Sequence, residues 1–179
     1  MDNQVQYFAI WLTPADSDYN VLSSIINDLR TRFDTDRFAP HSTLCSGEWR
    51  GDLDHLRAKV KLIADQFSTR RVAKTKIYYE NTKFQYFYVG LNESDLDAVF
   101  QCVRNKLPAS RPPKSRPHLS LLYSTQFNSV SREELSKEFN PRVPTHIHFD
   151  RLTLVFPENN DWDNISKWVE HDPPLRFNA

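Results

Sequence analysis

Two five-residue segments carry residue types that could do acid–base chemistry on a phosphate. They read PHSTL at residues 40–44 and PHLSL at residues 117–121, and both have the form P-H-x-[S/T]-L. Imidazole titrates near neutral pH, so one histidine can take up a proton while another delivers one at cellular pH. His41 and His118 are therefore a candidate acid and base pair acting on a phosphodiester.

The hydroxyl two residues after each histidine fits the same chemistry. Both segments predict strands, and side chains at positions i and i+2 of a strand share a face. Thr43 should therefore lie beside His41, and Ser120 beside His118. Each hydroxyl could then donate a hydrogen bond to a nonbridging oxygen of a bound phosphate.

A single H-x-[S/T] match is weak evidence for such a site. About one match is expected by chance in a chain with six histidines, and a lone copy is as readily a polar pair on a solvated strand face. The two copies, however, share their flanking Pro and Leu and hold the same place in two similar halves. Together they favour one imidazole on each side of a phosphate, and the sequence leaves open which of the two is the base.

The elements around the two segments repeat in order. Residues 7–79 and 84–156 each read as strand, helix, His-bearing strand, helix and strand. Short apolar or aromatic runs predict the strands, at residues 7–12, 41–45, 72–79, 84–91, 118–123 and 145–156. Apolar residues at steps of three and four predict the helices, which should begin near Asp16 or Ser17, at Asp52, behind Ser94, and at a Ser131–Glu134 capping box. An alignment of the two halves that places His41 on His118 also matches Trp11 with Tyr88 and Ile77 with Leu154. The pattern predicts an internal duplication within one domain that spans residues 1–179.

Composition narrows the class of protein. Lys plus Arg equal Asp plus Glu at 23 each, so long-range attraction to a nucleic acid is not built in. The two cysteines are too few for a disulfide framework or a paired zinc cluster, and the three glycines form no phosphate-binding loop. No signal segment or membrane span is indicated, and we expect an intracellular, cytoplasmic protein that binds no membrane.

The paired segments in a chain of this length resemble the two-histidine (2H) phosphoesterase superfamily, and within it the cyclic phosphodiesterases of plants and yeasts. The resemblance implies an α+β, bilobal fold with pseudo-twofold symmetry, in which two antiparallel sheets face a central cleft and helices lie outside. Exchange of elements between the lobes stays open. It also implies hydrolysis of ADP-ribose 1″,2″-cyclic phosphate, a by-product of tRNA splicing, to ADP-ribose 1″-phosphate, with His41 and His118 as the catalytic pair and Thr43 and Ser120 as phosphate ligands.

Two aromatic residues match the same family. Tyr123 corresponds to an aromatic residue that contacts phosphate, and Trp11 to one that lines the cleft. Strict alternation along a strand would turn Tyr123 away from the face of His118 unless the strand twists or bulges. Packing in the core is the alternative for both side chains.

Other functions stay open at this point. A nucleoside 2′,3′-cyclic phosphate could be the substrate, and the chain could instead be an RNA end-processing phosphodiesterase or ligase, or a nucleotide-binding module without activity. His146 and His148 lie two apart on a predicted strand, but no nearby carboxylate or cysteine cluster completes a metal site. We expect no cofactor, no metal, a small cyclic phosphate as the partner, no stable nucleic acid complex, and a monomer.

Overall fold

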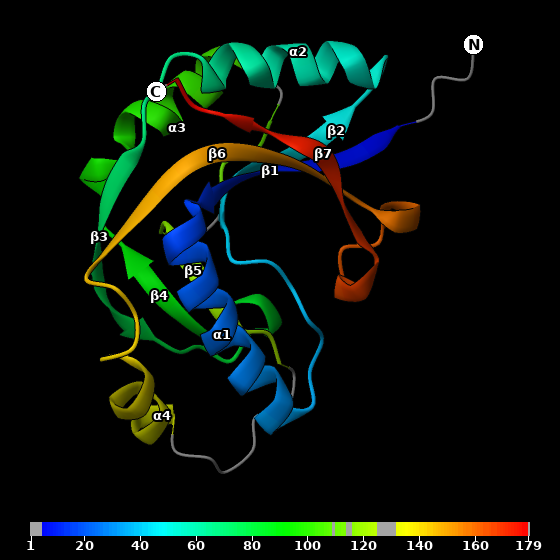
Figure 1. Cartoon of the computed structure of the whole chain (residues 1–179). Helices are drawn as coiled ribbons and strands as arrows, with labels where there is room; N and C mark the ends of the chain where they lie inside the picture. Colours follow the sequence, from blue (N-terminus) through cyan, green and yellow to red (C-terminus); the bar gives the residue numbers. More distant parts are fainter. Residues whose placement is uncertain (1–4, 109, 114–115, 125–131, 179) are drawn as a thin grey trace.

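The fold is known from a computed structural model, which describes residues 5–108, 110–113, 116–124 and 132–178. Within these residues the chain is an α+β fold built from four α-helices and a seven-stranded sheet (Figure 1). The strands are β1 (Gln6–Pro14), β2 (Ser42–Trp49), β3 (Arg70–Tyr78), β4 (Phe87–Leu91), β5 (His118–Leu122), β6 (His146–Pro157) and β7 (Trp168–Arg176). The helices are α1 (Asp16–Phe33), α2 (Leu53–Ala64), α3 (Asp97–Lys106) and α4 (Arg132–Phe139).

The strands follow one hydrogen-bonded path, β2-β1-β6-β3-β4-β5, and β7 adds to β6. Every pairing between these strands is antiparallel. β3 joins the two parts of the sheet, because its residues 70–73 pair with β6 and its residues 74–78 pair with β4. The α+β class is thus confirmed, whereas two separate sheets in a bilobal arrangement are not shown.

The order of the strands is symmetric with respect to the two halves of the sequence. The first half supplies β1, β2 and β3, and the second supplies β4, β5 and β6. If these are matched in order, the path reads the same from either end. In this path β1 lies beside β6, the third strand of the other half, and β4 likewise lies beside β3.

Helices α1 and α2 bury the faces that their sequence periodicity predicts. The buried residues recur at steps of one, three or four, and they are Leu22, Ile25, Ile26 and Leu29 in α1 and Leu56, Val60, Ile63 and Ala64 in α2. α1 packs against β5 and β1, whereas α2 packs against β6, β7 and α3. Figure 1 shows α2 and α3 lying together, with α1 set apart from them on the chain that follows β1.

Helix starts were predicted less well than helix faces. Asp52 caps α2 as expected, because its carboxylate accepts a hydrogen bond from the backbone N–H of Asp54 at 3.0 Å. The expected cap of α1 at Asp16 or Ser17 is wrong, because the N-cap is Ala15 and Asp16 is already helical. Asp16 instead forms an ion pair with Arg151, and its negative charge also interacts favourably with the positive end of the helix dipole. The expected capping serine at residue 131 lies outside the described residues.

Several strands differ from their expected bounds. His41 precedes β2, which starts at Ser42 and runs on to Trp49. β4 starts only at Phe87, because residues 83–85 form a 3₁₀ turn. β7 was not predicted at all: its sequence, WVEHDPPLR, is charged and carries two prolines, which a strand at the edge of a sheet tolerates.

None of the helices in the described part of the chain is long and apolar enough to cross a membrane.

Candidate active site

The two histidines are held by the same local contact. Nδ1 of His41 lies 2.7 Å from the carbonyl oxygen of Ala39, and Nδ1 of His118 lies 2.9 Å from that of Arg116. A carbonyl oxygen can only accept, so Nδ1 of each ring must carry the hydrogen. The lone pair of each neutral imidazole is therefore on Nε2. Each ring is anchored by the residue two positions before it, which fixes both its tautomer and its direction.

An aromatic ring lies against each imidazole. The indole of Trp11 stacks on His41 with ring centroids 3.6 Å apart and an interplanar angle of 9°. The ring of Tyr88 meets His118 edge-on, with centroids 5.0 Å apart and an angle of 61°. These two aromatic residues are the pair that the alignment of the two halves places at matching positions.

The same two aromatic residues are the strand partners of the two hydroxyl residues. Trp11 pairs with Thr43 between β1 and β2, and Tyr88 pairs with Ser120 between β4 and β5. In both ladders the register shifts at the residue directly before the aromatic one. The register shift thus falls at the same point of both pairings, and each half supplies a histidine, a hydroxyl residue and an aromatic residue at matching positions.

Tyr123 connects the two sets. Its hydroxyl lies 3.4 Å from Nε2 of His41, and it also interacts with the hydroxyl of Ser120. β5 ends at Leu122, so strand alternation does not govern the direction of Tyr123, which is 6% exposed. A residue two positions after the second segment thus contacts the catalytic candidate of the first segment, which places the two segments near one another.

Burial sets the protonation of both imidazoles. His41 is 5% exposed, and this desolvation lowers its pKa to about 3, against the opposing effect of the Ala39 carbonyl. The charge of His118 lowers the pKa of His41 further, so the two rings are close enough to interact. Desolvation also lowers the pKa of His118, opposed by the carbonyl of Arg116 and the carboxylate of Glu80. Both rings are neutral at cellular pH, and a bound phosphate anion would favour protonation of whichever serves as the acid.

The two hydroxyl candidates differ in their surroundings. Ser120 is 4% exposed, and its hydroxyl donates a hydrogen bond to the carbonyl oxygen of Phe84 at 3.0 Å. Thr43 is half-buried in β2. Ser120 must therefore turn its hydroxyl away from Phe84 before it can donate to a phosphate oxygen.

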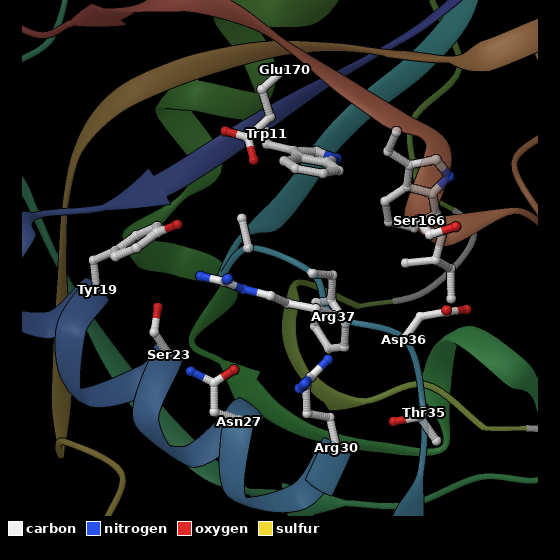
Figure 2. Close-up of a pocket in the computed structure, with 14 residues that line it drawn as sticks. Trp11, Tyr19, Ser23, Asn27, Arg30, Thr35, Asp36, Arg37, Ser166 and Glu170 are labelled. Carbon is white, nitrogen blue, oxygen red and sulfur yellow. The ribbon is translucent and has the colours of Figure 1, made fainter.

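Two cavities flank the pair of histidines. One, of about 550 Å³, is lined in part by Trp11 (Figure 2) and by Ala39. Both of these residues contact His41. The other, of about 700 Å³, is lined by Tyr88 and Arg116, which both contact His118. A group bound between the imidazoles could thus extend to either side.

The sequence did not reveal two further aromatic residues of the site. Phe38 stacks on Tyr123 with centroids 4.0 Å apart, and Trp168 lies 5.7 Å from Trp11 and 6.4 Å from His41, centroid to centroid. Phe38 could have been noticed, because it lies only three residues before His41. No sequence pattern pointed to Trp168, because it is the first residue of β7, a strand that was not predicted.

Other candidate ligands lie elsewhere. Nδ1 of His148 pairs with Asp18 at 2.9 Å, and His146 contacts Arg71. Among the residues that the structure describes, no three or more His, Cys, Asp or Glu side chains gather closely enough to hold a metal ion. Cys45 is buried in the core, where desolvation raises its pKa to about 11.

Solved structures share this fold. LigT of E. coli complexed with phosphate matches with a TM-score of 0.58 and 12% identity, covering 98% of this chain and 99% of LigT. LigT complexed with 3′-AMP matches with a TM-score of 0.56 and 12% identity, over 97% and 96% of the two chains. A crystal structure described as a phosphoesterase matches with a TM-score of 0.59 and 11% identity, over 97% and 99%. At such low identity the likeness shows the fold alone.

The sequence matches a family model more directly. The model is described as cyclic phosphodiesterase-like protein, and it matches residues 7–145, which include both histidine segments. No curated protein gives a significant match. The family match spans most of the chain, and we conclude that this protein belongs to the cyclic phosphodiesterase-like family, within the two-histidine phosphoesterase superfamily that its motifs resemble.

Proposed function

We propose that the protein hydrolyses a cyclic phosphodiester with His41 and His118 as the acid and base pair. The observation that supports this most strongly is the matched anchoring of the two rings, each by the carbonyl two residues before it. Both rings carry the lone pair on Nε2, the atom that must take or deliver a proton. The contact between Tyr123 and His41 supports the same site, since it brings the chain just after the second segment to the histidine of the first.

The reaction needs one water and two proton transfers. The neutral imidazole that acts as base takes a proton from water as the water oxygen attacks phosphorus. The bond from phosphorus to one ring oxygen breaks, and the other imidazole, protonated beside the phosphate, delivers its proton to that oxygen. Thr43, Ser120 and Tyr123 donate hydrogen bonds to the nonbridging oxygens, where charge is redistributed in the transition state. Either histidine can begin as the base, according to how the ring phosphate is bound.

The substrate that we propose is ADP-ribose 1″,2″-cyclic phosphate, with ADP-ribose 1″-phosphate as the product. Nucleoside 2′,3′-cyclic phosphates offer the same five-membered ring and are the second candidate. Trp11 stacks on His41 and borders the adjoining cavity, where the rest of the substrate could lie. E. coli LigT, which shares this fold, has been solved in complexes with phosphate and with 3′-AMP, which agrees with a site for phosphate and nucleotide groups.

Two other functions are less well supported. An RNA end-processing enzyme would need a basic groove along a strand of nucleic acid, and the net charge of this chain is zero. A binding module without activity would not need two imidazoles with matching tautomers. We further propose that the protein acts as an intracellular monomer with two lobes, without a metal.

A product-resolved assay tests this function. Purified protein is incubated in EDTA with ADP-ribose 1″,2″-cyclic phosphate and, in parallel, with adenosine 2′,3′-cyclic phosphate. We expect ring opening of at least one substrate to a single phosphomonoester. Binding of both without turnover would support the module instead, and activity that depends on added metal would contradict the metal-free mechanism.

A further inference from the structure

A polar stripe of α1 faces the cavity beside His41. Tyr19, Ser23, Asn27 and Arg30 follow one another at steps of three and four, so they share one side of the helix. All four line the cavity, and Figure 2 shows them in a row along α1. The buried residues of α1 occupy other positions of the helix, so packing of the core does not account for this stripe.

Two arginines of this cavity are free to bind an anion. Arg30 belongs to the stripe, and Arg37 comes from the loop that leads to β2. Figure 2 shows Arg37 reaching across the cavity toward Tyr19. Burial and then the charge of Glu170 raise the pKa of Tyr19, and the charge of Arg37 opposes them. Neither arginine forms an ion pair with any residue that the structure describes. Guanidinium groups without a carboxylate partner are well suited to phosphate oxygens.

The cavity adjoins His41 through two shared neighbours. Trp11 and Ala39 form part of its wall, and these same residues stack on His41 and accept its hydrogen bond. A substrate whose cyclic phosphate lies at His41 can therefore extend its remaining groups into the cavity. The volume of about 550 Å³ is that of a typical small-ligand site.

The cavity on the other side suits an anion less well. It is lined by Glu80, Glu93 and Arg116, and Arg116 already lies 3.7 Å from Glu93. Glu80 accepts a hydrogen bond from the Tyr88 hydroxyl at 2.7 Å. Two carboxylates against one paired arginine give that cavity a net negative charge. In the cavity beside His41, Arg30 and Arg37 balance the two carboxylates, Asp36 and Glu170, so a diphosphate is better accommodated there.

We infer that the cavity beside His41 is a subsite for a diphosphate-linked nucleoside. Arg30 and Arg37 bind the diphosphate, and the hydroxyl and amide groups of Ser23 and Asn27 bind the sugar. The inference rests on the proposed function. Such a subsite makes the enzyme selective for cyclic phosphates that carry an ADP-like group over plain nucleoside cyclic phosphates.

The test compares two substrates in matched variants. Arg30→Gln/Arg37→Gln removes both cations, and Arg32→Gln is the control, because Arg32 lies on the same helix but pairs with Glu138 at 2.9 Å. We expect kcat/KM for ADP-ribose 1″,2″-cyclic phosphate to fall ~10- to 100-fold in the double variant, mainly through KM, since these contacts are remote from the reacting phosphorus. Turnover of adenosine 2′,3′-cyclic phosphate should change by less than ~3-fold, which also reports correct folding.

Equal losses on both substrates, or no loss on the ADP-ribose substrate, would overturn the subsite. If the double variant does not fold, the single variant Arg37→Gln, at an exposed loop residue, gives the same comparison. Calorimetric titration with ADP-ribose separates this inference from the proposed function. Binding by the unchanged protein that weakens at least ~10-fold in the arginine variant supports the subsite even if neither substrate is hydrolysed, and equal binding by both proteins refutes it.

Discussion

The imidazole of His41 lies flat on the indole of Trp11, with 3.6 Å between the ring centroids. This contact covers one face of the imidazole, while the carbonyl of Ala39 fixes its edge. Trp11 is 3% exposed, and it also borders the cavity beside the site. We therefore predict that Trp11 positions His41 and also forms a wall for the substrate.

Replacing Trp11 should misplace the imidazole. We expect Trp11→Leu to lower kcat ~10-fold, because small displacements of a proton-transfer group are costly, and Trp11→Phe to recover most of this loss through its flat ring. Steady-state kinetics on the preferred cyclic phosphate measure kcat and KM separately. A change in KM alone, with the same result for Leu and Phe, would mean that Trp11 contacts substrate only.

Burial of the histidines should make stability depend on pH. The pKa of His41 is about 3 in the folded protein and 6.5 in its ordinary state, and that of His118 is also lowered. Between these values the unfolded chain binds the protons and the folded chain does not. The free energy of unfolding therefore falls as pH drops from 6.5 toward 3, by up to ~1.4 kcal/mol per pH unit for His41, and the lowered pKa of His118 adds to the fall in the same direction.

Urea unfolding at several pH values measures this effect. The variant His41→Gln should show a shallower fall below pH 6.5 than the unchanged protein, and replacement of the exposed His55 by Gln serves as the control. Identical pH profiles for the His41 variant and the unchanged protein would mean that His41 does not remain neutral when buried.

The hydroxyl of Tyr123 can be removed without disturbing its ring. The ring packs on Phe38, whereas the hydroxyl reaches Nε2 of His41. We expect Tyr123→Phe to lower kcat ~10-fold while the melting temperature changes little, because a donor near the phosphate is lost but the packing stays. Kinetics and thermal unfolding on the same sample separate the two effects, and full activity would assign Tyr123 to the core alone.

Neighbouring hydroxyls of β2 should behave oppositely. Thr43 is predicted to bind phosphate, whereas Oγ of Ser42 is buried without a hydrogen-bond partner in the described part of the chain. Thr43→Ala should cost ~10- to 100-fold in kcat/KM. Ser42→Ala should keep activity and leave stability unchanged or raised, because an unsatisfied polar group is removed. Comparable losses in both variants would contradict the predicted role of Thr43.

Much of the fold was predictable because its periodicities are strong. The apolar steps that predicted α1 and α2 are the faces that these helices bury. The repeat of elements also has a counterpart in the symmetric strand order, and we infer a duplication in which the third strands, β3 and β6, are exchanged between halves. The exchange of these two strands could not be predicted, because a sequence pattern indicates that a strand forms but not which strand it pairs with.

The site was predictable where the motif is local. The anchoring of His41 and His118 depends on residues only two positions away, within the same short segments. The position of Tyr123 depends instead on where β5 ends, and that of Trp168 on an edge strand without alternation. The placement of Arg30 and Arg37 could not be predicted, since only the folded α1 and the loop after it bring these two residues into one cavity with Trp11 and Ala39.

The proposed mechanism depends most directly on turnover after removal of each imidazole. His41→Ala, His118→Ala and the control His55→Ala, on the exposed side of α2, are compared at saturating cyclic phosphate and equal protein concentration. We predict that each of the first two variants loses at least ~100-fold in kcat while His55→Ala keeps full activity. Full turnover in either His41→Ala or His118→Ala would contradict the two-histidine mechanism.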